Sequence, residues 1–445
     1  MAEPGTIDPR AIKVKKNLNL FDSTANLKLG IESARTVGCR IVNVGPENFI
    51  KKQPHLVLGV LWQVIRIAIT RSIGLRDVPE IANLLQDGEE LTDLLKLNPE
   101  QILMRWLNFH LKKSGVDRRV NNLGNDLKDQ EVFVRVLNQL EGCDLSALET
   151  EDVKERGDKV IEGAKTIGAK NYMTAREITK GNAKINTVFV SSLFNAKHGL
   201  PDLNADMYEA AKMLDDDVEG TEEERAYRMW INSLNIEDVY CNNLYEDGRD
   251  GVMHSKIINR LKAGTIDMKK IDLKAKNKFA LSGNCTQVVN GAKALGLKII
   301  GVDGTDFNEA KRKPILGVVW QMMRYHYLSV IGGRTEDQIL EWANGMIKDE
   351  EHRIKSFKDK SLANGQFYIK LCAGIEPRAV DWDIVQKGEE EEEQKNNAKY
   401  ALSIARKLGA TVFCVWEDLA KVNGKWVFIF VASLLDTWEE MQKKD

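Results

Sequence analysis

The chain has 445 residues, of which 43% are hydrophobic and 29% are charged. These shares are close to those of an average globular protein and exclude a wholly disordered or collagen-like chain, and the length predicts about two to four domains. Lys and Arg together number 64 and Asp and Glu 66, a net charge of −2, so the chain lacks the overall positive field that nucleic-acid-binding proteins use.

The N-terminal segment and the cysteines indicate a soluble, intracellular protein. Met1–Arg10 has no apolar stretch, so we expect no signal peptide. The longest apolar stretch, Leu56–Ile69, is too short to span a bilayer and predicts a buried helix. The six cysteines include no C-x-x-C pair. This argues against a zinc site or a disulfide framework and predicts reduced, mostly buried thiols.

One short pattern, an Ala and a basic residue followed three positions later by Gly, occurs four times along the chain. The copies are Ala34–Gly38, Ala164–Gly168, Ala292–Gly296 and Ala405–Gly409. Each predicts the end of a helix, capped by a glycine in the left-handed conformation. Each is followed by an apolar segment of helical length, and these segments begin near Pro54, Ala183, Pro314 and Gly424.

A second pattern, Trp-x-Asn, opens three of the repeats. It occurs at Trp106, Trp230 and Trp342, each within a stretch with helical spacing of apolar residues. We predict that these tryptophans, together with Trp62 and Trp320, anchor the core. The matching Trp of the first repeat would fall before residue 1. The first repeat therefore lacks its opening helix, and the sequence contains roughly three and a half repeats.

The odd repeats resemble each other more than they resemble the even ones. Gly5–Asp8 has the same sequence as Gly264–Asp267, and Leu58–Arg66 matches Leu316–Arg324 through the shared pattern Leu-Gly-Val-[Leu/Val]-Trp-Gln. The order is A-B-A-B, as expected for a duplicated two-domain module.

Helical spacing dominates, which predicts an all-α protein. Thr335 followed by Gln338 is typical of a capping box. The two strand-like runs, Lys298–Val302 and Val412–Trp416, lie between predicted helices and are interpreted as extended connectors.

Patterns for catalysis or cofactor binding are missing. The six histidines show no H-x-x-x-H spacing, and no G-x-S-x-G elbow or Walker loop is present. Asp247–Gly251 lacks EF-hand spacing and predicts a turn between helices. We therefore predict no catalytic residue, no metal site, no cofactor and no enzymatic activity.

Two stretches contain basic residues and no acidic ones. They are Lys51–Arg76, with Lys51, Lys52, Arg66, Arg71 and Arg76, and Lys311–Arg334, with Lys311, Arg312, Lys313, Arg324 and Arg334. One interpretation is solvated helix ends beside an apolar core. The other is a docking helix for an acidic partner, and two such helices would let one chain hold two copies of that partner.

Taken together, these patterns resemble tandem calponin-homology domains. The shared marks are the opening Trp-x-Asn helix, the helix ending in Leu-Gly or Ile-Gly, and the closing helix introduced by Pro. Four such domains in A-B-A-B order resemble the fimbrin (plastin) family. The resemblance implies an all-α fold of two actin-binding modules, with domains at 1–75, 99–200, 219–331 and 335–445.

The resemblance also implies the function, which is binding of actin filaments and their cross-linking into bundles by a monomeric cytoplasmic protein of the actin cytoskeleton. No nucleic-acid or membrane partner is expected. The actin contacts of the family correspond to Leu56–Ile69, Gln101–Lys113, Glu224–Leu234, Lys311–Tyr327 and Glu336–Met346. Within and beside these segments, the expected contact residues are Lys51, Lys52, Leu58, Gln63, Arg66, Lys112, Lys113, Arg228, Lys311, Arg312, Lys313, Gln321 and Arg324.

The sequence departs from the family in lacking N-terminal EF-hands and the opening helix of the first domain. We expect this second absence to leave apolar surface uncovered. The same domains could instead form a scaffold that binds microtubules or a signalling partner, whereas nothing in the sequence favours a hydrolase or transferase.

Overall fold

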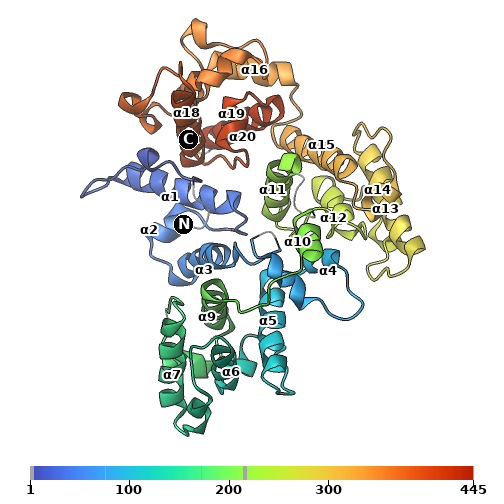
Figure 1. Ribbon diagram of the computed structural model, residues 1–445. Helices are drawn as coiled ribbons and strands as arrows, with labels where there is room; N and C mark the ends of the chain where they lie inside the picture. Colours follow the sequence, from blue (N-terminus) through green and yellow to red (C-terminus); the bar gives the residue numbers. More distant parts are fainter. Residues whose placement is uncertain (1–4, 76, 172, 214–217, 444–445) are drawn as a thin grey trace. The chain divides into compact units, whose positions relative to one another are not determined.

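The computed structural model describes residues 5–75, 77–171, 173–213 and 218–443, and these residues form α-helices, short 3-10 helices and connectors without any β-strand (Figure 1). The chain divides into two compact units. One contains residues 3–64 together with 220–445, and the other contains residues 65–219. The prediction of an all-α fold is confirmed, and both strand-like runs are connectors.

The helices of each repeat follow the predicted order. The first repeat has α1 (Leu20–Thr36), α2 (Pro46–Ile50) and α3 (Pro54–Thr70), and α4 (Leu91–Leu95) leads to the second, with α5 (Pro99–Lys113), α6 (Glu131–Gln139), α7 (Val153–Thr166), α8 (Ala175–Lys180) and α9 (Ala183–Ala196). After α10 (Ala205–Met213), the third has α11 (Val218–Ser233), α12 (Val252–Leu261), α13 (Lys278–Ala294), α14 (Gly304–Asn308) and α15 (Arg312–Val330). The fourth has α16 (Glu336–Gly345), α17 (Gln366–Ile375), α18 (Glu391–Leu408), α19 (Trp416–Ala420) and α20 (Gly424–Gln442).

The predicted helix ends are confirmed. The four repeat glycines have positive φ angles, namely 99° at Gly38, 82° at Gly168, 82° at Gly296 and 117° at Gly409, where a glycine costs little strain. Three closing helices begin at the predicted residue, and α15 begins two residues before Pro314. Thr335 caps α16 and forms the expected capping box with Gln338.

The Trp-x-Asn pattern has a structural explanation. Trp106 and Trp230 are fully buried, which confirms their predicted place in the core. In each copy, the Asn side chain pairs with one backbone unit of the connector that follows the helix: Asn108 with Val120, Asn232 with Cys241 and Asn344 with Ile354. The pattern therefore combines a core anchor with a clamp on the next segment.

Trp62, Trp320 and Trp342 are only half-buried. The prediction that these three side chains anchor the core is therefore wrong. Trp320 and Trp342 pack against the rim of the core. Five of the six cysteines are buried and Cys143 is half-buried, and all six are free thiols, as predicted.

A buried polar side chain also recurs twelve residues before the repeat glycine. Asn284 and Asn397 donate from Nδ2 to two backbone carbonyls, those of Asp250 and Asp272 and those of Asn364 and Gln386, respectively. In the second repeat this position is Arg156, whose guanidinium donates to the carbonyls of Asp129 and Thr150.

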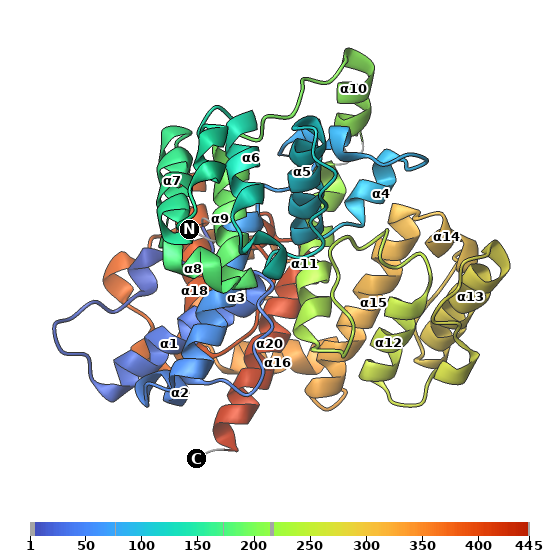
Figure 2. The same cartoon turned by 90° about the horizontal axis from the view of Figure 1, so that it is seen from below.

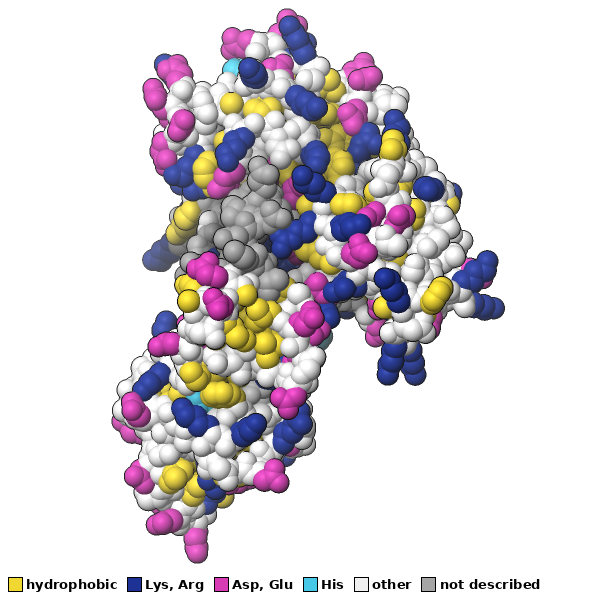
Figure 3. Space-filling model, turned by 45° about the vertical axis from the view of Figure 1, so that its right-hand side comes forward, with side chains coloured by type: hydrophobic (Ala, Val, Ile, Leu, Met, Phe, Trp, Pro, Cys, Tyr) yellow, Lys and Arg dark blue, Asp and Glu magenta, His cyan; other side chains and the backbone are white. Residues whose placement is uncertain are grey.

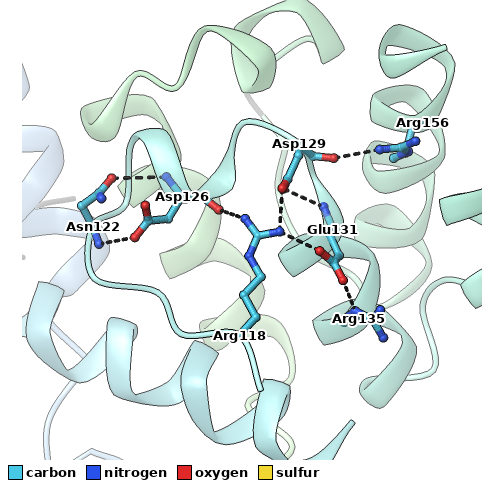
Figure 4. A network of polar contacts seen from close by, with 7 residues as sticks. All are labelled: Arg118, Asn122, Asp126, Asp129, Glu131, Arg135 and Arg156. Carbon is cyan, nitrogen blue, oxygen red and sulfur yellow. Dashed lines mark hydrogen bonds and ion pairs between the residues drawn. The ribbon is translucent and has the colours of Figure 1, made fainter. Parts of the chain in front are cut away.

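Around Arg156, the second repeat builds a larger polar network (Figure 4). Arg118 pairs with Asp129 at 2.5 Å and with Glu131 at 2.7 Å, and Glu131 also pairs with Arg135 at 2.7 Å. The two ion pairs of Arg118 raise its pKa against the lowering effect of burial. This network fixes the loop before α6.

The first repeat has no opening helix among the described residues, and its α1 instead packs against α18 of the fourth repeat (Figures 1 and 2). Basic side chains of α18 reach the N-terminal segment. Arg406 donates to the carbonyl of Thr6 at 2.5 Å, and Lys407 donates to the carbonyl of Ala11 at 2.9 Å. Burial lowers the pKa of Arg406 to about 10. The first and fourth repeats therefore share one interior.

Candidate functional site

The predicted actin-contact residues lie mainly on α3 and α15, the closing helices of the odd repeats. Residues of α3 correspond to residues of α15 that lie 258 positions later, so each predicted residue of one helix can be compared with its counterpart. The comparison separates side chains that the fold itself uses from side chains that remain available to a partner.

The two glutamines of the shared pattern are clamps within the fold. The Gln63 side chain accepts the backbone N–H of Arg40 at 2.6 Å and donates to the carbonyl of the same residue at 3.0 Å. Gln321 makes the same pair with the backbone of Lys298, at 2.7 and 2.8 Å. Both amides thereby hold the connector that follows the repeat glycine. This structural role explains why both closing helices carry Gln at this position.

The two arginines of the pattern each join an odd repeat to the opening helix of the next even repeat. Arg66 makes a two-pronged ion pair with Glu100 of α5, with Nη2 2.8 Å from Oε2. Arg324 pairs with Glu336 of α16 at 2.7 Å, and its guanidinium also lies 5.7 Å from the ring centre of Phe428. Glu100 and Glu336 occupy the same position, six residues before the Trp of their helices.

Because of these ion pairs, the stretches without acidic residues in the sequence do have acidic neighbours in the structure. Burial raises the pKa of Glu100, but the hydrogen bond and charge of Arg66 outweigh it, so that the net pKa is lowered and the carboxylate stays charged. Acidic side chains from elsewhere in the chain therefore neutralise part of each predicted basic patch. Of the residues counted in those patches, Arg76 lies outside the described part of the chain.

The basic cluster at the start of α15 is divided in the same way. Lys311 pairs with Asp306 and Glu309, both at 3.0 Å, and its hydrogen bonds to these carboxylates raise its pKa. Arg312 lies over the ring of Tyr245, 5.4 Å from its centre. Lys313 is exposed, and no described carboxylate pairs with it. Lys313 is thus exposed and available to a partner.

The other predicted basic residues fall into two groups. Arg228 of α11 pairs with Glu224 at 3.2 Å and is only 27% exposed, so it belongs largely to the third repeat's own packing. Lys51 and Lys52 follow α2, and Lys112 and Lys113 end α5; all four are exposed, and within the described residues they have no ion-pair partner.

The apolar face of α3 is exposed, which makes the prediction of a buried helix over Leu56–Ile69 wrong. Leu58 is 62% exposed, Leu61 47% and Ile65 44%. The counterparts of the last two, Val319 and Met323, are fully buried. Among the described residues, α15 packs against α12, α14 and α20, and no α-helix of the first repeat precedes α1 to cover α3 in the same way. This is the uncovered apolar surface that the sequence analysis expected.

The described residues offer little that supports chemistry. They contain no group of three or more His, Cys, Asp or Glu side chains placed to hold a metal ion. An open hollow of about 510 Å³ beside α16 is lined by Asp337, Leu340, Glu341, Asn344, Gly345 and Arg353, without a Cys or His nucleophile. None of the described helices is long and apolar enough to cross a membrane.

Surface charge is mixed. The face drawn in Figure 3 shows basic, acidic and hydrophobic side chains interspersed rather than a single charged field.

The sequence alone does not identify side-chain clamps such as Asn108 and Gln63 as structural. The signal that could have identified them is their fixed distance from a Trp or Gly of the same repeat.

Comparison with known proteins gives a consistent result. The calponin-homology domain family matches residues 1–70, 97–199, 221–328 and 333–440. Fimbrin-3 of Arabidopsis thaliana is 38% identical over 98% of the chain, and fimbrin of Saccharomyces cerevisiae is 36% identical over 97% of it. The chain spans 62% of the length of the first relative and 70% of the second.

A solved structure is similar throughout. The actin-crosslinking core of Schizosaccharomyces pombe fimbrin superposes with a TM-score of 0.82 at 31% identity, covering 98% of this chain and 89% of that one.

Proposed function

The chain belongs to the fimbrin and plastin family of tandem calponin-homology proteins, and we propose that it binds actin filaments and cross-links them into bundles. The observation that carries this proposal is similarity to an actin-crosslinking core over nearly the whole chain. The duplicated closing helices support it, since a cross-linker needs two binding modules.

We further propose domain boundaries at 1–75, 99–200, 219–331 and 335–445, and a monomeric, non-enzymatic protein acting in the cytoplasm on the actin cytoskeleton. Each module would contact a filament through its odd closing helix and its even opening helix. The residues best placed for this are exposed lysines that pair with no carboxylate in the described part of the chain, namely Lys51, Lys52, Lys112, Lys113 and Lys313. Exposed lysines favour an acidic partner, as the docking-helix interpretation expects.

The ion-paired residues have a second role in this proposal. Arg66 and Arg324 join the domains of a module, and Gln63 and Gln321 hold the closing helix in place. They would shape the actin-binding surface rather than supply most of its charge. Leu58 is 62% exposed and adds an apolar contact.

Co-sedimentation with actin filaments tests the proposal. At high speed, where single filaments pellet, we expect the chain to pellet with actin; at low speed, we expect actin to pellet only when the chain is present. Failure to pellet at high speed would refute actin binding, and pelleting only at high speed would refute cross-linking. Co-pelleting with microtubules and not with actin would support the scaffold alternative.

A further inference from the structure

The third repeat exposes a loop in which lysines surround two apolar side chains. The lysine loop, residues 268–279, runs from the short 3-10 helix Met268–Lys270 into the first turn of α13. It contains a single acidic residue, Asp272. Leu273 is 61% exposed and Phe279 is 93% exposed. Its five lysines are all exposed: Lys269, Lys270, Lys274, Lys276 and Lys278.

The lysine loop is held in a fixed shape from inside the domain. Asn284 accepts the backbone N–H of Asp272 and donates to its carbonyl, both at 2.9 Å. Ile271 is buried with 5% exposure, and Asn277 caps α13 by accepting the N–H of Ala280 at 2.9 Å. With its backbone tied at these points, the loop keeps Leu273 and Phe279 pointing away from the core.

The first repeat shows what covers the equivalent surface elsewhere. Phe21, the counterpart of Phe279, lies beneath the guanidinium of Arg378, 3.9 Å from the ring centre. Lys13 in the preceding loop pairs with Asp381 at 3.2 Å. Over the third repeat, by contrast, no described carboxylate pairs with the five lysines. The surface therefore suits a partner that offers both negative charge and apolar material.

We propose that the lysine loop binds an anionic lipid surface, with the ammonium groups on head-group phosphates and with Phe279 and Leu273 entering the interface. Two projecting apolar side chains flanked by five exposed lysines match a bilayer interface, where apolar side chains enter below the head groups and lysines meet the anionic phosphates. Such binding is peripheral. It departs from the expectation of no membrane partner and is independent of actin binding.

Flotation of the full chain with vesicles tests this inference. Vesicles of phosphatidylcholine with about 30% phosphatidylserine should carry the chain, and phosphatidylcholine alone should not. The triple substitution Lys274→Glu, Lys276→Glu and Lys278→Glu should weaken binding by roughly 100-fold. The matched control Lys348→Glu, Lys355→Glu and Lys360→Glu makes the same change in net charge at exposed fourth-repeat lysines and should have little effect.

A second variant isolates the apolar contribution. Because both side chains are exposed, Leu273→Ser with Phe279→Ser should leave the melting temperature unchanged and weaken vesicle binding by about tenfold. No binding to anionic vesicles, equal losses in both triple variants, or full binding by the double variant would each overturn the inference. If the unaltered chain does not bind anionic vesicles and the Lys274 triple variant loses actin pelleting, the loop is an actin contact instead.

Discussion

Helices α3 and α15 share the sequence Leu-Gly-Val-[Leu/Val]-Trp-Gln but have different neighbours. On α15, which packs against α12, α14 and α20, Val319 and Met323 are fully buried. On α3, the counterparts Leu61 and Ile65 are 47% and 44% exposed. The pattern of apolar residues therefore defines which face of a helix can be buried, but only the presence of covering helices decides whether it is.

The two helices agree, however, on their contacts with the following even repeat. Both carry the Gln clamp, and both place an Arg against a Glu at the start of the next opening helix. The joint between domains is thus preserved where the domain interior is not. The difference between α3 and α15 concerns stability within a domain, and the similarity concerns the architecture of a module.

Truncating the covered face should give the largest contrast. Met323→Ala removes a fully buried side chain and should lower the free energy of unfolding by about 2–5 kcal/mol. The matched substitution Ile65→Ala acts on a side chain that is 44% exposed and should cost below about 1 kcal/mol. Urea unfolding of the two variants measures the contrast. Equal losses would mean that α3 is as well covered as α15.

The titration of His326, which lies on α15, should give the next largest effect. His326 accepts a hydrogen bond from Trp230 of α11 at 3.1 Å, and burial, followed by the charge of Arg260, lowers its pKa to about 4. The counterpart on α3 is Ala68. A histidine whose pKa is lowered on folding stabilises the fold fully above its unfolded pKa, and this contribution is lost as the pH falls from about 6.5 towards 4.

We therefore expect His326 to contribute a loss of about 1 kcal/mol in unfolding free energy per pH unit over that window. His326→Gln keeps a hydrogen-bond acceptor for Trp230 and cannot titrate, so its stability should fall less steeply with acid. Unfolding measured at pH 7, 6 and 5 gives the slopes. Equal slopes for both proteins would show that protonation of His326 does not contribute to the loss of stability in acid. His110 and His254 remain in both and cancel in the comparison.

The two Arg–Glu ion pairs should give a smaller contrast, in which the pair on α3 contributes more to stability than the pair on α15. Arg66 and Glu100 are 28% and 23% exposed, whereas Arg324 and Glu336 are 40% and 51% exposed. Double-mutant cycles with alanine should give a coupling of about 1–2 kcal/mol for the first pair and below about 1 kcal/mol for the second, because solvent screens the more exposed pair. A larger coupling in the second pair would contradict this order.

The sequence predicts the repeats well because helix ends and core anchors are local features. Gly38 ends its helix through its own positive φ angle, and the large apolar side chain of Trp106 favours burial whichever segments pack on it. It does not reveal what Gln63 or Arg66 does, since their partners lie in other segments and depend on how the helices pack. The exposure of α3 lies between these cases, because the sequence shows no Trp-x-Asn pattern before Gly38 but does not show the exposed fraction of Leu58.

The smallest expected effect concerns exposed lysines that form no ion pair with any described residue. Lys52→Glu beside α3 and Lys313→Glu on α15 should each weaken actin binding by about two- to fivefold, with reduced salt sensitivity and an unchanged melting temperature. Arg324→Glu is the informative control, because reversing a charge that faces Glu336 should also lower stability. If each module binds one filament, either lysine variant should lose low-speed pelleting of actin before it loses high-speed pelleting. Equal loss of both would place the two lysines on a single binding surface.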